Sequence, residues 1–143
     1  MIFSFGQSEQ ERIAVDVHGY ERETSGEYWD DNWLTVDICV RAGGFRGKAA
    51  ATIITSELTK FLSELRPLYE TLNGSAQFET MEEQLSLRLI GDGKGHVELR
   101  GKVADQPGIG NSLNFTLQFD QSQLGASIRE LERVALQFPE RVT

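Results

Sequence analysis

The stretch NWLTVDICVRAGGFRGKAAATIITSELTKFLSELRPL, residues 32–68, decides the fold because its hydrophobic periodicity changes once. Apolar residues alternate from Leu34 to Val40, which is the period-two pattern of a half-buried strand. The glycines within residues 41–44 interrupt that pattern and indicate a hairpin. From Thr55 onward, apolar residues recur every three or four positions, which predicts an amphipathic helix. An antiparallel hairpin that leads directly into a helix indicates an α+β protein.

The register of this hairpin follows from the position of its turn. We expect a two-residue turn at Ala42-Gly43, which pairs Val40 with Phe45. The same turn sets Asp37 opposite Lys48, and opposite charges across neighbouring strands are favourable. In this register one face of the second strand carries its apolar residues, namely Phe45, Ala49, Ala51 and Ile53.

The first helix is predicted over residues 55–74. The hydroxyl of Thr55 or Ser56 supplies an N-cap, and Gly74 provides a left-handed stop. Pro67 lies off the apolar stripe and should kink the helix without ending it. The apolar stripe consists of Leu58, Phe61, Leu62, Leu65, Leu68, Tyr69 and Leu72.

The second helix is predicted over residues 120–139. Asp120 is its N-cap, Gln123 completes a capping box, and Pro139 stops it. A shift of 66 positions, from Leu58 to Leu124, aligns the apolar stripe of the first helix with that of the second. The alignment has two explanations: a β…βα duplication, or the resemblance of any two amphipathic helices. The buried stripe consists of Leu124, Ile128, Leu131, Ala135 and Phe138.

The remaining alternating segments complete an antiparallel β-sheet of about six to eight strands. We expect the two amphipathic helices to pack on one face of this sheet, in a single α+β domain over residues 1–143. The further predicted strands are residues 12–20, 75–79, 85–90, 96–103 and 113–120.

The stretch LIGDGKGHVEL, residues 89–99, carries three glycines, an aspartate, a lysine and a histidine, a composition that also occurs in phosphate and metal loops. Its spacing fits neither a P-loop, a dinucleotide fingerprint nor a calcium loop. Pairing Gly91 with Gly95 sets Leu89 opposite Val97 and leaves residues 92–94 as the loop. The stretch therefore predicts a hairpin turn.

The composition of the chain limits the class of partner and the cellular compartment that we expect. The chain has 22 acidic and 14 basic residues, a net charge of −8 and a pI near 4.8. This balance argues against a nucleic-acid partner, and no apolar run reaches the roughly 20 residues of a membrane span. The N-terminus lacks the features of a secretory leader, and the single cysteine, Cys39, suits a cytoplasmic protein. We expect Cys39 to be a packed thiol.

The most unusual stretch is EYWDDNW, residues 27–33, in which aromatic residues flank carboxylates. Exposed aromatics beside acidic residues suit a protein-binding surface, while a turn at residues 30–32 with a covering tryptophan is the structural alternative. No catalytic constellation, cofactor motif or metal-ligand spacing is present, so we expect no cofactor and no metal. The candidate partner-binding residues are Tyr28, Trp29, Asp30, Asp31 and Trp33.

Several motifs together resemble the WapI-family immunity proteins of bacteria and their relatives. They are DDNWLTVDICV, GGF, TSEL with FL and LYETL, GDGKGHVELRGKV and NSLNFTLQFDQSQL, and they cover roughly residues 28–138. The resemblance implies a cytosolic, non-enzymatic protein that binds and neutralises a toxin from its own strain. It implies no catalytic residue in this chain.

Two functional hypotheses follow. In the first, the chain is a binding protein of the immunity type, and its acidic surface favours a toxin domain with a basic face. In the second, it is a small ligand-binding domain or an enzyme with a pocket between sheet and helices. A polar cavity with converging ionisable side chains would favour the second hypothesis.

Overall fold

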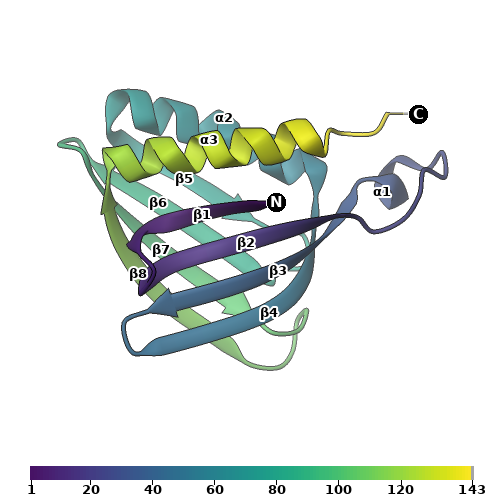
Figure 1. Cartoon of the computed structure of the whole chain (residues 1–143), viewed down its shortest axis with the longest axis horizontal. Helices are drawn as coiled ribbons and strands as arrows, with labels where there is room; N and C mark the ends of the chain where they lie inside the picture. The colour runs from purple at the N-terminus through teal and green to yellow at the C-terminus, as the bar shows by residue number, and fades with distance from the viewer. Residues whose placement is uncertain (143) are drawn as a thin grey trace.

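The computed structural model describes residues 1–142 as eight strands and three helices (Figure 1). Strands β1–β4 form one antiparallel sheet in sequence order, and β5–β8 form another. A long helix follows each sheet, so the order of four strands and a helix occurs twice. The elements are β1 (Ile2–Ser8), β2 (Glu11–Tyr20), α1 (Tyr28–Asp31), β3 (Trp33–Ala42), β4 (Phe45–Ile54), α2 (Thr55–Thr71), β5 (Asn73–Glu79), β6 (Leu85–Asp92), β7 (His96–Ala104), β8 (Ser112–Asp120) and α3 (Gln121–Gln137).

The α+β class, the antiparallel strands and the two long helices are confirmed. The structure divides the eight strands between two sheets, a choice that alternation alone does not make, because a half-buried strand has the same period in either arrangement. Strand β1 and the one-turn helix α1 are additions that the sequence pattern did not predict.

The core lies between the two sheets and under the helices. Alternate residues of each strand point inward, and aromatic rings from both halves of the chain meet there. The ring of Phe61 in α2 lies 4.9 Å from that of Phe78 in β5 and 5.7 Å from that of Phe5 in β1. Because β1 and β5 belong to different sheets, these contacts join both halves into one apolar cluster.

Helices α2 and α3 pack against each other and cover the open side of the two sheets (Figure 1). Helix α2 contacts chiefly β5, and α3 contacts chiefly β1. The helices approach closely at Gly125, where a Cβ atom would lie only 2.9 Å from the ring of Tyr69. None of the helices in residues 1–142 combines the length and apolarity needed to cross a bilayer. The predicted inward residues are all buried: Leu58, Leu62, Leu65, Leu124, Ile128 and Leu131.

The ends of the first helix differ from the prediction. Neither Thr55 nor Ser56 caps α2; instead, the carboxylate of Glu57 accepts the backbone N–H of Ile54 at 2.7 Å. The helix stops when Leu72 adopts a left-handed φ of 62°, two residues before Gly74.

The second helix begins as predicted, because Asp120 accepts the backbone N–H groups of Ser122 and Gln123. The side chain of Gln123 accepts the N–H of Asp120 in return, at 2.9 Å, and this completes the capping box. Helix α3 ends at Gln137, just before Pro139.

The β3–β4 hairpin turns at Gly43-Gly44, one residue later than predicted. Lys48 therefore lies opposite Cys39, and Asp37 lies opposite Ala50. A register error of two residues leaves every side chain on its predicted face, because the side-chain period of a strand is also two. Phe45 was predicted to lie on the apolar face of β4 together with the core residues. Instead it lies at the hairpin end and is 69% exposed.

The glycine stretch is a hairpin turn, as its spacing predicted. Asp92 is the last residue of β6, and its Oδ1 accepts the backbone N–H groups of Lys94 and His96 at 2.7 and 3.1 Å. These bonds lower the pKa of Asp92 below its ordinary value. Gly93 and Gly95 have φ values of 82° and 99°, which other residues rarely adopt. The register is again shifted by two, with Leu89 opposite Leu99.

Candidate functional site

Residues 27–32 of the candidate stretch lie in the connection between β2 and β3, where α1 forms a single turn, and Trp33 begins β3. The structure gives its residues different environments. The indole of Trp29 is 59% exposed, and Asp30 is also exposed. Tyr28 and Trp33 are half-buried, whereas only 1% of Asp31 is exposed. The stretch is therefore a folded unit with one outward-facing aromatic residue.

Asp31 uses its carboxylate inside the connection. Its Oδ1 accepts the hydroxyl of Ser25 at 2.7 Å and the backbone N–H of Ser25 at 2.8 Å, and its Oδ2 accepts the N–H of Gly26 at 3.0 Å. The Ser25 hydroxyl is the main cause that holds the pKa of Asp31 below 3.8. Asp31 thus shapes the connection, and of the two aspartates only Asp30 faces solvent.

Asn32 is a buried residue of this site that the sequence reasoning did not select. Its Nδ2 donates to the carbonyl oxygens of Tyr28 and Arg141 at 2.8 and 2.9 Å. Its Oδ1 accepts the backbone N–H of Arg141 at 2.8 Å and the hydroxyl of Thr55 at 3.0 Å. One side chain therefore ties together α1, the start of α2 and the chain after α3.

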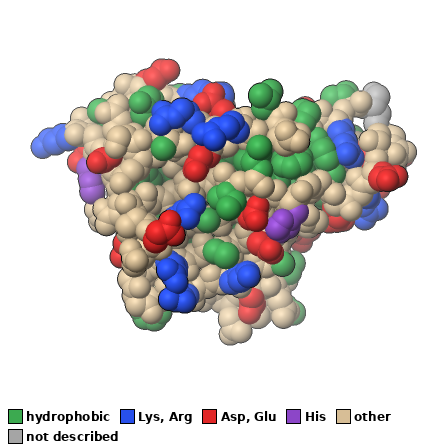
Figure 2. Space-filling view, in the orientation of Figure 1, with side chains coloured by type: hydrophobic (Ala, Val, Ile, Leu, Met, Phe, Trp, Pro, Cys, Tyr) green, Lys and Arg blue, Asp and Glu red, His purple; other side chains and the backbone are tan. Residues whose placement is uncertain are grey.

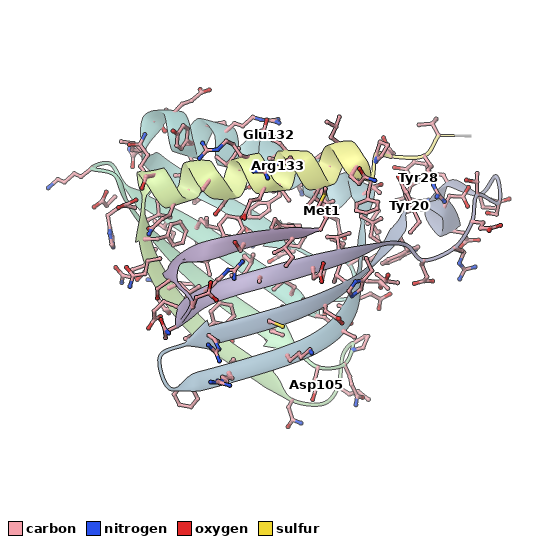
Figure 3. All side chains as sticks on the ribbon, in the orientation of Figure 1. Met1, Tyr20, Tyr28, Asp105, Glu132 and Arg133 are labelled. Atoms are coloured by element: carbon pink, nitrogen blue, oxygen red, sulfur yellow. The ribbon has the colours of Figure 1, made fainter. Side chains whose placement is uncertain are left out.

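Residues 139–141, which follow α3, contact the β2–β3 connection and the end of β2. The hydroxyl of Tyr28 donates to the carboxylate of Glu140, and this bond raises the pKa of Tyr28. The hydroxyl of Tyr20 donates to the carbonyl of Pro139, and the guanidinium of Arg141 lies 3.4 Å above the Tyr20 ring. Figure 3 shows Tyr20 and Tyr28 together at the end of the molecule where this segment runs. No local pattern in the sequence indicates contacts between residues more than 100 positions apart.

The result is a supported aromatic and acidic surface, which we call the α1 surface and define as Tyr28, Trp29 and Asp30. The ring of Trp29 lies 5.2 Å from that of Tyr28 in an edge-on arrangement. Exposed Glu23 and Glu27 lie in the same connection. Figure 2 shows acidic, basic and hydrophobic side chains at this end of the molecule. An exposed indole beside carboxylates suits recognition of another protein.

The pocket expected between sheet and helices corresponds to a hollow of about 240 Å³ between α2 and β5. Two of its carboxylates already accept hydrogen bonds from the backbone. Glu64 accepts the N–H of Gln77 at 3.0 Å, and Glu57 accepts the N–H of Met81 at 2.8 Å. Burial raises the pKa of Glu57. Within residues 1–142, no group of three His, Cys, Asp or Glu side chains is placed to hold a metal ion. Glu64 therefore fastens α2 to β5, and Glu57 fastens the start of α2 to the turn after β5.

The chain is similar in fold to the crystal structures of trypanosoma bruciei MRP1/MRP2, with a TM-score of 0.50 and 12% sequence identity. The match covers 95% of this chain and 84% of the other. Identity this low shows the shared fold alone. Comparison with curated protein sequences finds no significant match. The family model described as the immunity protein WapI-like family matches residues 3–139.

Proposed function

This chain belongs to the immunity protein WapI-like family, and from that premise we propose that it binds and neutralises a toxin protein. We propose further that it does so in the cytoplasm, as one folded domain and without catalysis. The family match supports the binding role, because it spans almost all of the chain. The toxin is the partner that the family description implies, and no cofactor enters the proposal.

The exposed indole of Trp29 is the observation that assigns this proposed binding to particular residues, because the turn that bears it is held in place by hydrogen bonds. Aromatic residues that bury a large area on binding are frequent hot spots of protein interfaces. The hydrogen bonds of Asn32 and Asp31 order the turn before the partner arrives, which reduces the entropy lost on association. We therefore propose the α1 surface as the toxin contact, with Trp29 as anchor. Asp31 positions the turn and does not contact the toxin.

The net charge of −8 supports a partner with a basic face. Complementary charges speed diffusional encounter, and this effect weakens with salt because exposed charges are screened over about 8–10 Å near physiological ionic strength. Asp30, Glu23 and Glu27 are the exposed carboxylates nearest to the proposed anchor in sequence. They would act on the association rate more than on the lifetime of the complex.

The alternative is a ligand-binding domain or enzyme that uses the hollow between α2 and β5. It would require Glu57 and Glu64 to release their backbone partners before they could act on a ligand. The two functions separate experimentally, because Glu64→Gln should impair the alternative function and leave toxin binding intact.

The experiment is co-expression of this chain with the product of each gene that neighbours its own gene, followed by co-purification and kinetics of association. We expect a stable complex whose association rate falls as salt rises. Asp30→Asn should slow association, while Glu70→Gln, an equal charge change on exposed α2, should leave it unchanged. Failure of every neighbouring gene product to form a complex would contradict the immunity function.

A further inference from the structure

A row of arginines crosses the outer face of the first sheet near the β3–β4 hairpin. Arg12 in β2 lies directly opposite Arg41 in β3, and Arg41 lies directly opposite Arg46 in β4. We call these three residues the arginine ladder. Lys48 lies in the next row, opposite Cys39. Figure 2 shows basic side chains in the lower part of the molecule, where Figure 1 places β3 and β4.

Like charges directly opposite each other on neighbouring strands destabilise a sheet. Within residues 1–142, no carboxylate lies within 4.0 Å of Arg41 or Arg46, and the ion pair of Arg12 with Glu9 is long, at 3.6 Å. The fold thus leaves the repulsion in the ladder largely uncompensated. A residue arrangement that weakens the fold is often retained for binding.

The aspartates of the same sheet face provide the contrast. Asp16 lies opposite Asp37, which is also a like-charge pair. Each aspartate has a basic partner: the N-terminal amine of Met1 lies 3.1 Å from Asp16, and His18 lies 3.0 Å from Asp37. Both aspartates of this row therefore contact a basic group, whereas among the ladder arginines of the described residues only Arg12 has a carboxylate within 4.0 Å.

A hollow of about 400 Å³ accompanies the ladder. Its lining includes the small residues Ala14, Cys39 and Gly47. Cys39 was expected to be a packed thiol, but it is exposed because it lies on the outer face of β3. Because these lining residues are small, they leave room between the longer basic side chains for groups of a partner.

We propose that the arginine ladder binds an acidic helix of a partner protein, with the helix axis crossing the strands. Neighbouring strands lie about 4.8 Å apart, so three arginines span about 10 Å. Carboxylates on one helix face at positions i, i+3 or i+4, and i+7 also span about 10 Å, since a helix rises 1.5 Å per residue. Three same-side carboxylates of an extended chain span about 13 Å, which fits less well.

Several observations favour a protein over a nucleic acid as the occupant. The basic patch is small, because the Asp16 and Asp37 row lies only four residues along the strands. Nonspecific nucleic-acid binding relies on a longer basic track and on aromatic side chains for stacking. Within residues 1–142, the exposed aromatic residue beside the ladder is Phe45 at the hairpin end, where it can contact an apolar side of a helix.

This inference does not depend on the proposed function. Strand β3 joins the α1 surface at its start to the ladder at its end, so the two surfaces lie about 30 Å apart along the strand. Variants of Trp29 and variants of Arg41 therefore test different surfaces of one molecule.

The test measures binding of short fluorescent peptides to the whole chain by anisotropy at low salt. The first probe is an alanine-based helical peptide with a glutamate at every third or fourth position along one face. A second peptide has glutamine at those positions, and a third is extended with alternating glutamates. A short single-stranded DNA serves as the nucleic-acid probe. We expect the helical acidic peptide to bind at least about tenfold more tightly than the other three.

Variants connect the binding to the ladder. The double variant Arg41→Gln with Arg46→Gln should weaken binding of the acidic helix at least about tenfold. The matched control, Arg66→Gln with Arg129→Gln, removes the same charge from exposed helix positions and should change it by less than about twofold. A bulky maleimide on Cys39, the single cysteine of the chain, should also block binding.

The proposal is overturned if the ladder variant binds the acidic helix as well as the unmodified chain does. It is also overturned if the DNA binds more tightly than the helix, since the ladder would then be a phosphate surface, or if no probe binds. Each of these outcomes is distinct from failure of the immunity function, which is read from Trp29 and the toxin.

Discussion

The two halves of the chain share a frame and differ in their connections. In each half, a four-stranded antiparallel sheet leads directly into a 17-residue helix. The β2–β3 connection of the first half spans residues 21–32 and contains α1, whereas the equivalent β6–β7 connection is the glycine turn at residues 93–95. The frame accounts for the fold, and the connection unique to one half carries the candidate site.

The outer faces of the two sheets differ as well. On the second and third strands, Asp16 lies opposite Asp37 in the first sheet, and Arg88 lies opposite Arg100 in the second. The buried side chains of the same strands are apolar. Because an outer face does not contribute to the core, its charges can differ between the halves while the frame stays the same.

The largest expected effect tests the equivalence of the two helices. Leu65 and Leu131 occupy matching positions in α2 and α3, and both are fully buried. Leu65→Ala and Leu131→Ala should each lower the free energy of unfolding by about 2–5 kcal/mol, since each leaves a cavity. Urea denaturation measures both. A single cooperative transition is expected in each case, and a near-zero effect at either position would break the equivalence.

The next effect separates the long connection from the glycine turn. Asn32→Ala removes four hydrogen bonds from buried groups and should destabilise the chain by about 1–3 kcal/mol. Asn114→Ala, on the exposed face of β8, should change stability by less than about 0.5 kcal/mol. Equal effects of the two substitutions in thermal denaturation would show that the network around Asn32 adds nothing.

A smaller effect of opposite sign concerns the arginine ladder. Arg41→Gln removes the central charge of three and should stabilise the chain by about 0.2–1 kcal/mol at low salt. The gain should shrink as salt is added, because salt already screens the repulsion. Denaturation at two ionic strengths provides the measurement. Destabilisation by Arg41→Gln would mean that the ladder is a structural feature.

The smallest expected effect is on the pH dependence of stability, which should differ between the carboxylates at the starts of α2 and α3. Hydrogen bonds from Ser122 and Gln123 lower the pKa of Asp120 below 3.8, so its contribution is present above that value and is lost as pH falls through the folded pKa. Burial raises the pKa of Glu57 above 4.5, so stability declines as pH rises from 4.5 through the folded pKa.

Melting temperatures measured from about pH 3 to pH 7 test these opposite signs. Asp120→Asn should flatten the loss of stability on the acid side. Glu57→Gln should flatten the decline above pH 4.5 and leave the acid side intact. The same change of slope in both variants would contradict the two assignments.

The sequence predicted the faces of the strands more reliably than their partners. Alternation placed Leu34, Val36, Leu87 and Leu89 inside, and all four are buried. Both hairpin registers were wrong by two residues, because the exact turn depends on which glycines adopt positive φ, as Gly43 and Gly93 do. The division into two sheets depends on contacts between distant strands, which local periodicity does not encode.

Within the candidate site, residue type selected Trp29 as a candidate contact but did not indicate the hydrogen bonds that support the turn around it. Asn32 looks like an ordinary turn residue, and its role depends on Arg141, which lies 109 positions away. The burial of Asp31 was not predicted either, since nothing in the sequence marks Ser25 and Gly26 as its hydrogen-bond partners. Long-range hydrogen bonds of this kind have no signature in a single sequence.

The most direct test compares the two equivalent connections in one binding measurement. Calorimetry of the toxin complex should show at least about a tenfold weaker Kd for Trp29→Ala, with an unchanged melting temperature, because an exposed anchor is lost without damage to the core. Lys94→Ala in the glycine turn should leave the Kd within about twofold of the unmodified chain. An unchanged Kd for Trp29→Ala, or complete loss of binding for Lys94→Ala, would contradict the assignment of function to the β2–β3 connection.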